Sequence, residues 1–353
     1  MNILFTCSAR KWGGNEAWVL NAAKVLEKKH KVILAYRKAE IGDRFSIEKH
    51  QLPFRHEGDF QTLASLVALI RKKQIDVVVP TKRKDYFLAG LACKLTGAKN
   101  ILILGIVRDL NNTLINNIVY NRLADGIMVN AQMIKDVLLR SPFMHSDKVA
   151  VVPNSIDIDT TALKPAKKPF PFLITALGEL SERKGFDFLI RGFAHFVKQH
   201  NITDAGLTII GAGGQQENLA SLADARGVGN LVTLMGFQKD PYPYLLSSDV
   251  FALTSKNEGL PYATLEAALL NNAIITTKAG GVEELLKNRK HCLYVDYGNE
   301  QQLADAINEL YTNSSLRHKL AANARTVTEE QFSLERMEQE MIGFFRYIKN
   351  KRP

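Results

Sequence analysis

Two glutamates, Glu258 and Glu266, bracket a short polar turn that leads into a helix. The turn runs from Ser255 to Gly259, and Pro261 marks the expected first position of the helix. The free N–H groups and positive dipole end of such a helix bind anions such as phosphate. Carboxylate oxygens only accept hydrogen bonds, so the two glutamates suit the hydroxyl donors of sugar or ribose. The local chemistry therefore predicts a ligand with phosphate at its centre and polyols at its ends, which describes a sugar nucleotide.

A buried strand must position this turn, and residues 249–254 are apolar and β-branched enough to form one. The same alternation of strand and helix continues along the chain. Further strands are expected at Asn2–Ser8, Lys31–Tyr36, Ile75–Pro80, Asn100–Val107, Gly126–Val129, Val149–Pro153, Phe172–Leu177, Leu207–Gly211, Leu231–Gly236 and His291–Val295. Helices are expected from Asn15 to about Lys29, at Thr62–Lys73, Leu114–Leu123 and Phe186–His200, from Pro261 to about Asn271, and after an N-cap at Ser333. This pattern predicts doubly wound parallel sheets that bind ligands at the carboxyl ends of their strands.

The stretch EGLPYATLEA, followed by Gly280, Gly281 and Glu283, resembles the E-x7-E signature of retaining glycosyltransferases of group 1, or family 4. The resemblance implies the GT-B fold, with two Rossmann-like domains facing a cleft and a C-terminal helix crossing back to the first domain. A helix with one carboxylate near its favourable end and another on its solvated face would also fit the two glutamates alone.

The resemblance implies that Arg183, Lys184 and Glu258 form the catalytic group. The segment GELSERKG is similar to the family's GRL–RKG segment, whose cations hold the donor diphosphate, although Glu179 replaces the first arginine. Glu258 would hold sugar hydroxyls and Glu266 the ribose, while a solvated cation pair remains the alternative for Arg183 and Lys184. The donor-binding residues that the resemblance implies are Gly13, Gly14, Gly211, Phe237, Gly259, Leu260, Pro261, Tyr262, Ala263 and Glu266.

The turn Gly13-Gly14-Asn15-Glu16 is similar to a GG-x-E turn that follows the first strand in the family. Alone, the glycine pair also fits a plain tight turn. The residues expected on the acceptor side are Glu16, Arg108 and Asp109. Arg108 stands where many relatives carry a histidine, and an ordinary surface ion pair explains Arg108 and Asp109 equally well.

The length of 353 residues favours two domains. The proline- and lysine-rich stretch 151–171 contains PNSID, which resembles the family's PNGID at the domain boundary. We therefore expect an acceptor-side domain at 1–158, joined by a helix at 333–350, and a donor-binding domain at 159–332.

The formal net charge of +10 is concentrated in the N-terminal half. Residues 1–160 hold 24 Lys+Arg against 15 Asp+Glu, or +9, and the remainder holds 22 against 21, or +1. Such asymmetry suits an anionic acceptor or an anionic membrane surface, although each basic cluster alone could be a solvated helix end. No nucleic-acid-binding module accompanies the charge, so nucleic acid is not expected as a partner.

Three scattered cysteines predict free thiols in a reducing compartment, and their spacing suggests no metal site. The Asp157-Ile158-Asp159 triplet lies in the expected linker and is interpreted as solvated. No apolar run approaches the ~18 residues that span a bilayer, and the N-terminus does not resemble a secretory signal. The expected location is the cytoplasm, with peripheral attachment to the inner face of the cytoplasmic membrane.

The resemblance implies a metal-independent retaining glycosyltransferase of hexosyl type. It would need no cofactor beyond its co-substrate, a UDP-sugar first, with GDP- and ADP-sugars as alternatives. The acceptor would be a glycan or glycolipid, with lipopolysaccharide or another cell-surface glycan as the leading product. A GT-B phosphorylase, a sugar-nucleotide epimerase and a non-catalytic sugar-nucleotide-binding protein remain as alternatives.

Overall fold

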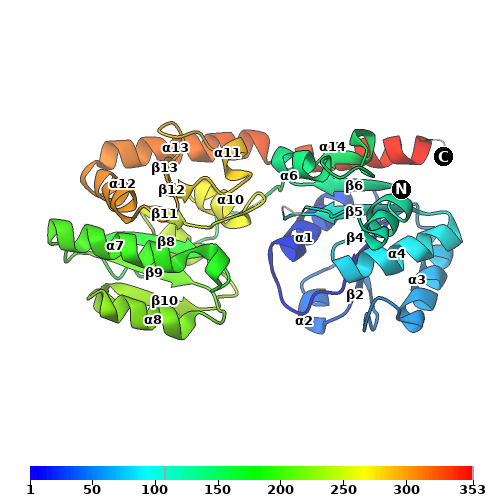
Figure 1. Cartoon of the computed structure of the whole chain (residues 1–353), viewed down its shortest axis with the longest axis horizontal. Helices are drawn as coiled ribbons and strands as arrows, with labels where there is room; N and C mark the ends of the chain where they lie inside the picture. The colour runs from blue at the N-terminus through cyan, green and yellow to red at the C-terminus, as the bar shows by residue number, and fades with distance from the viewer. Residues whose placement is uncertain (107–108, 157, 352–353) are drawn as a thin grey trace. The chain divides into compact units, whose positions relative to one another are not determined.

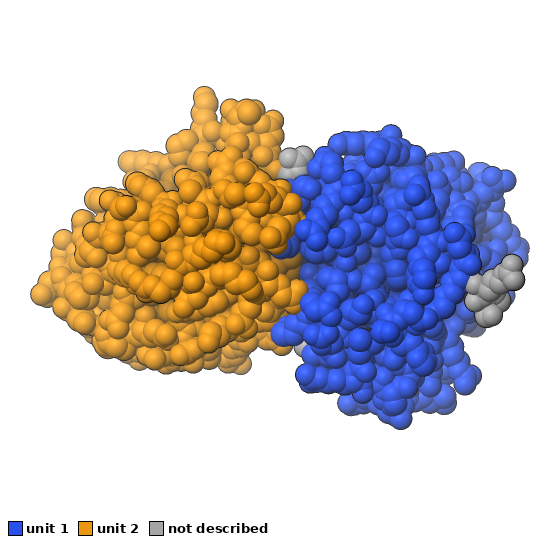
Figure 2. Space-filling model, turned by 90° about the horizontal axis from the view of Figure 1, so that it is seen from above, with its two compact units in different colours: residues 1–157, 332–353 blue, residues 158–331 orange. Residues whose placement is uncertain are grey.

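The structure is a computed structural model that describes residues 1–106, 109–156 and 158–351. The chain divides into two compact units, which are coloured separately in Figure 2. Unit 1 comprises residues 1–157 and 332–353, and unit 2 comprises residues 158–331.

Unit 1 is built on a parallel sheet of seven strands in the order β3-β2-β1-β4-β5-β6-β7. The strands are β1 (Asn2–Cys7), β2 (Lys31–Tyr36), β3 (Glu48–Gln51), β4 (Val77–Pro80), β5 (Lys99–Leu104), β6 (Gly126–Val129) and β7 (Val149–Val151). The order reverses between β1 and β4, and a ligand site is expected beyond the carboxyl ends of strands at such a point.

Helices of unit 1 accompany this sheet, and most of them bury apolar residues. They are α1 (Gly14–Leu26), α2 (Ala39–Gly42), α3 (Phe60–Lys73), α4 (Arg83–Thr96), α5 (Leu114–Asn117), α6 (Gln132–Leu138) and α14 (Leu334–Asn350), with shorter turns at η1 (Ile118–Arg122) and η2 (Ser146–Lys148). Helices α1 and α14 lie side by side, as do α3 and α4 (Figure 1). Ser333 caps α14 by accepting a hydrogen bond from the N–H of Arg336, as the sequence predicts.

Unit 2 contains a second parallel sheet, of six strands in the order β10-β9-β8-β11-β12-β13. The strands are β8 (Phe172–Leu177), β9 (Ala205–Ile210), β10 (Val232–Gly236), β11 (Val250–Leu253), β12 (Ala273–Thr277) and β13 (Leu293–Val295). The helices are α7 (Phe186–His200), α8 (Gln216–Ala225), α9 (Tyr242–Leu246), α10 (Tyr262–Leu269), α11 (Val282–Leu285), α12 (Glu300–Thr312) and α13 (Ser314–Gln331), with turns at η3 (Glu182–Lys184) and η4 (Gly229–Leu231).

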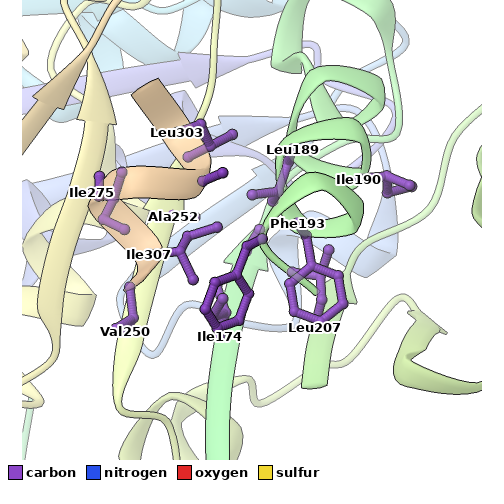
Figure 3. Packing of buried hydrophobic residues seen from close by; sticks show 14 of the residues in the cluster. Ile174, Leu189, Ile190, Phe193, Leu207, Val250, Ala252, Ile275, Leu303 and Ile307 are labelled. Atoms are coloured by element: carbon purple, nitrogen blue, oxygen red, sulfur yellow. The ribbon is translucent and has the colours of Figure 1, made fainter. Parts of the chain in front are cut away.

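The core of unit 2 lies between one face of this sheet and helices α7 and α12. Figure 3 shows Phe193 of α7 and Ile307 of α12 meeting Ile174 and Val250 of the central strands. Burial of these side chains fixes the positions of the strand ends, and therefore of the loops that follow them.

The expected fold of two doubly wound parallel α/β domains is confirmed. Several boundaries differ, however. Pro261 precedes α10 as its N-cap with extended backbone (φ −74°, ψ 122°), and the helix ends at Leu269. Among the described residues, none of the helices is long and apolar enough to cross a membrane.

Candidate functional site

In unit 2, the loops that follow β8 and β11 meet at the carboxyl edge of the sheet, because these two strands are neighbours. The loop after β8 contains η3 with its two cations, and the loop after β11 runs from Thr254 to Pro261. The glutamate and the cations proposed from the sequence are therefore brought together by strand order.

The turn that carries the cations is fixed to the second loop by hydrogen bonds to its backbone carbonyls. The N–H of Lys256 donates to the carbonyl of Arg183 at 2.9 Å, and the hydroxyl of Thr254 donates to the carbonyl of Gly185 at 3.0 Å. Gly185 has φ +64°, and a β-carbon there would lie 2.1 Å from the Thr254 carbonyl oxygen. Only glycine fits this position, so the geometry of the turn explains the glycine that follows Arg183 and Lys184.

Glu258 is 9% exposed, and three hydrogen-bond donors lie around a single oxygen of its carboxylate. Lys184 Nζ lies 2.7 Å from Glu258 Oε1, and Arg183 Nη1 lies 2.9 Å from the same atom. The hydroxyl of Ser255 also donates to Oε1, at 2.7 Å. The arrangement holds two positive charges and one negative charge at the sheet edge.

Two opposing effects act on the pKa of Glu258. Burial raises it, but the charges of Lys184 and Arg183, with the hydrogen bonds from Lys184 and Ser255, lower it by more. The net result is a pKa below the usual value, so Glu258 is ionised at neutral pH.

Glu266 is partly buried in α10, and its carboxylate faces a different environment. Burial raises the pKa of Glu266 to about 7, and its hydrogen-bond partner among the described residues is the hydroxyl of Tyr242, which donates to Oε1 at 3.4 Å. Burial, together with the charge of Glu266, also raises the pKa of Tyr242. A carboxylate with one weak partner can accept further hydroxyl donors.

The segment that joins these glutamates leads into the N-terminus of α10. Gly259, Leu260 and Pro261 are buried, while Tyr262 and Ala263 are partly exposed in the first turn of the helix. The first N–H groups of a helix have no partner within it, so this end can bind an anion.

The remaining predicted donor residues of unit 2 lie on neighbouring loops. Gly211 follows β9 with φ +148°, and it packs against the backbone of Gly178. Phe237 follows β10 and is 59% exposed. The structure explains why position 211 is a glycine, and it leaves the Phe237 ring accessible.

The predicted residues of unit 1 lie at the carboxyl edge of the other sheet. Gly13 is the N-cap of α1 and Gly14 begins it, and both glycines are exposed. Glu16, by contrast, is 1% exposed and forms an ion pair with Lys82, with Nζ to Oε1 at 2.8 Å. Its carboxylate folds beneath the turn, since a β-carbon on Gly13 would lie 3.2 Å from Glu16 Oε2.

Two acceptor-side candidates remain. Asp109 is exposed in the loop after β5. Arg108 lies outside the described residues.

Sequence reasoning missed Lys82, Ser255 and Tyr242. Lys82 belongs to one of the basic clusters, for which the sequence suggests a solvated helix end or an anionic partner, whereas the structure pairs it with Glu16. The sequence identifies Ser255 only as part of a polar turn. Nothing in the sequence near Tyr242 predicts the contact of Tyr242 with Glu266.

Comparison with known proteins agrees with this architecture. The model of glycosyl transferases group 1 matches residues 157–327, and the model of glycosyltransferase family 4 matches residues 12–160. Together the two matches extend from residue 12 to residue 327. The fold is GT-B, and the chain belongs to the group 1 glycosyltransferases.

One curated relative is the lipopolysaccharide core biosynthesis glycosyltransferase LpsE of Rhizobium meliloti. It is 29% identical over 201 residues, which are 57% of this chain and 55% of the relative. The chain spans about half the length of the first curated relatives that it matches.

Two solved structures share the whole fold at low identity. Anabaena HepE, solved in complex with UDP and glucose, has a TM-score of 0.84 at 19% identity, covering 98% of this chain and 99% of that one. A glycosyltransferase from Rickettsia africae has a TM-score of 0.84 at 19% identity, covering 99% of each chain.

Proposed function

We propose that this protein transfers a sugar from a nucleotide-sugar donor to an acceptor hydroxyl, with retention of configuration at the anomeric carbon and without a metal ion. The observation that carries the proposal is the convergence of Arg183 and Lys184 on Glu258 beside the N-terminus of α10. Cations and helix amides offset the charge of a departing diphosphate, and the glutamates accept hydroxyl hydrogen bonds.

In the proposed reaction, the bond between the anomeric carbon and the donor phosphate oxygen breaks. A bond from the acceptor oxygen to the same face of that carbon forms, and the acceptor proton passes to the leaving phosphate. Arg183 and Lys184 stabilise the diphosphate as its charge develops. Glu258 positions the sugar hydroxyls and Glu266 the ribose.

A UDP-sugar is the first donor to test, because HepE was solved with UDP-glucose. GDP- and ADP-sugars remain in the test panel. Gly13, Gly14 and Gly211 would offer backbone to the donor, and Phe237 would lie by its base. LpsE is named for lipopolysaccharide core biosynthesis, which supports lipopolysaccharide or a related cell-surface glycan as the product here.

The experiment is a thermal-shift panel of sugar nucleotides and free nucleotides on the wild type, Glu266→Ala and Glu330→Ala. Glu330 is an exposed glutamate on α13 and serves as the matched control. We expect one nucleotide class to raise the melting temperature of the wild type and Glu330→Ala, and not that of Glu266→Ala. No shift with any nucleotide would contradict the proposal. Donor incubated with free phosphate then separates transfer from phosphorolysis and epimerisation.

We also propose that unit 1 binds an anionic bilayer at the cytoplasmic face of the membrane, through the outer side of α3. Phe60 is 82% exposed and Leu95 is 59% exposed. Together with Leu63, Val67 and Arg71 they line a shallow groove of about 530 Å³. An apolar stripe this exposed marks an interaction surface, and the neighbouring cations complement anionic headgroups.

The cations beside this groove are Arg71, Lys72 and Lys94, all exposed. Sedimentation with vesicles that contain phosphatidylglycerol tests the surface. Phe60→Ser with Leu95→Ser should release the protein, whereas Leu114→Ser with Ile115→Ser, which alters other exposed apolar residues of unit 1, should not. Equal binding of both double variants, or no binding of the wild type, would contradict the membrane proposal.

A further inference from the structure

Trp12 lies directly before the turn that opens α1, and its indole ring is held in place on the surface of unit 1. The Arg44 guanidinium carbon lies 4.3 Å from the ring centroid, and the buried ring of Phe45 lies 6.4 Å away at a tilted angle of 57°. Part of Trp12 remains exposed. A fixed, partly exposed aromatic face is suited to binding an apolar surface at little cost in side-chain entropy.

Polar groups adjoin the indole along the chain. Gly13 and Gly14 are exposed at the N-terminus of α1, and Asn15 is partly exposed with its Nδ2 donating to the Thr81 carbonyl at 3.4 Å. An amide side chain both donates and accepts, so it can bind either end of a hydroxyl group.

A second amide lies close to Asn15. A β-carbon built on Gly105 would lie 2.9 Å from Asn15 Oδ1 and 3.5 Å from Asn130 Nδ2. Asn130 is 6% exposed; its Nδ2 donates to Asn154 Oδ1 at 3.2 Å, and its own Oδ1 is buried without a partner among the residues that the structure describes. A buried amide oxygen without a partner costs free energy, which a ligand or water hydrogen bond would recover.

We infer that Trp12 and Asn15 form a subsite for a pyranose ring, and that the ring is the sugar of the acceptor that receives the transferred residue. A pyranose presents C–H groups on one face, which stack on the indole, and hydroxyls at its edge, which bind the side-chain amide of Asn15. Arg44 covers one side of the indole, so the pyranose ring stacks on the part of the indole that remains exposed. This inference rests on the proposed function and narrows its acceptor to a sugar.

Tryptophan fluorescence tests the subsite directly, because the chain has two tryptophans and the other, Trp18, is buried. The probes are methyl α- and β-pyranosides of glucose, galactose, mannose and N-acetylglucosamine, with glycerol 3-phosphate as the non-sugar comparison. The variants are Trp12→Ala, Trp12→Phe and Tyr347→Ala. Tyr347 is an exposed aromatic of the same unit with the Lys351 ammonium 5.9 Å from its ring centroid, so it is a matched control.

We expect at least one pyranoside, and not glycerol 3-phosphate, to change the fluorescence of the wild type and of Tyr347→Ala. Saturation-transfer NMR should show affinity for that sugar reduced about tenfold in Trp12→Ala and less in Trp12→Phe, as expected for loss of a stacking contact. Nucleotide thermal shifts should be the same in all four proteins.

A response to no pyranoside, or one that persists in Trp12→Ala, overturns the subsite. A preference for glycerol 3-phosphate overturns the assignment of a sugar. In either case, a rise in the melting temperature of the wild type with a nucleotide still supports the proposed transferase function. Failure of the pyranose subsite is therefore distinguishable from failure of the proposed function.

Discussion

Gly211 and Gly178 approach so closely that a β-carbon on Gly211 would lie 1.8 Å from the carbonyl oxygen of Gly178. The contact joins the ends of β8 and β9, and the N–H of Leu180 donates to the carbonyl of Ala212 at 3.1 Å beside it. These two contacts fix the start of the loop that contains Arg183 and Lys184.

Gly211→Ala is therefore expected to destabilise unit 2 by about 3 kcal/mol or more, because it adds both a clash and a strained φ of +148°. Gly214→Ala is the control, because a β-carbon there meets no atom of the described residues within 4 Å. Urea unfolding of both variants measures the difference. Equal midpoints would show that the backbones do not approach this closely.

Lys184→Met is expected to lower the free energy of unfolding by about 1–3 kcal/mol, since it removes one of two cations from the buried carboxylate of Glu258. Lys290→Met, an exposed lysine elsewhere in unit 2, should change it by less than about 0.5 kcal/mol. The stabilisation should be present above pH 4.5, the usual carboxyl pKa, and decline as the pH falls, because the folded pKa of Glu258 is lowered. If the destabilisation caused by Lys184→Met does not diminish at low pH, loss of the ion pair with Glu258 is not its cause.

Glu266→Gln is expected to stabilise the ligand-free protein above pH 7. Burial raises the folded pKa of Glu266 from the usual 4.5 to about 7, so between pH 4.5 and 7 the native state holds a proton that the unfolded state has lost. Stability from this group is full below pH 4.5 and falls as the pH rises to about 7, by roughly 3 kcal/mol. Unfolding curves of wild type and variant from pH 4 to 8 should converge at the acidic end. Parallel curves would contradict the raised pKa.

Asp85 should act similarly in unit 1. It is fully buried, its Oδ2 accepts the Ser8 N–H at 2.9 Å, and burial raises its pKa from 3.8 to about 6. Its contribution to stability should therefore fall between pH 3.8 and 6, and Asp85→Asn should remove that slope. Asp109→Asn, at an exposed aspartate of the same unit, should leave the slope unchanged.

The sequence predicts best those elements whose own side chains determine their structure. Phe186–His200 and Gly126–Val129 begin and end where apolar spacing places them. By contrast, β3 has the polar sequence EKHQ with no buried residue, and it forms because β2 offers a free edge. No local sequence pattern predicts such a strand.

The candidate site divides in the same way. Glu258 and Glu266 lie within one recognisable stretch, so their proximity to a helix N-terminus follows from local sequence. The pairing of Glu16 with Lys82 depends on β1 and β4 being neighbours. Likewise, the contact of Tyr242 with Glu266 depends on the packing of α9 on α10. Such contacts require strand order and helix packing, which motifs do not encode.

Helix α14 joins the rest of unit 1 only after all of unit 2 has been made, because residues 158–331 interrupt unit 1 in the sequence. On the ribosome, unit 2 is complete while α1 still lacks the helix that packs beside it. The nascent chain must therefore keep an unfinished unit 1 soluble throughout the synthesis of unit 2. An expression fragment that stops at residue 157 would leave the same apolar surface of α1 uncovered and favour aggregation.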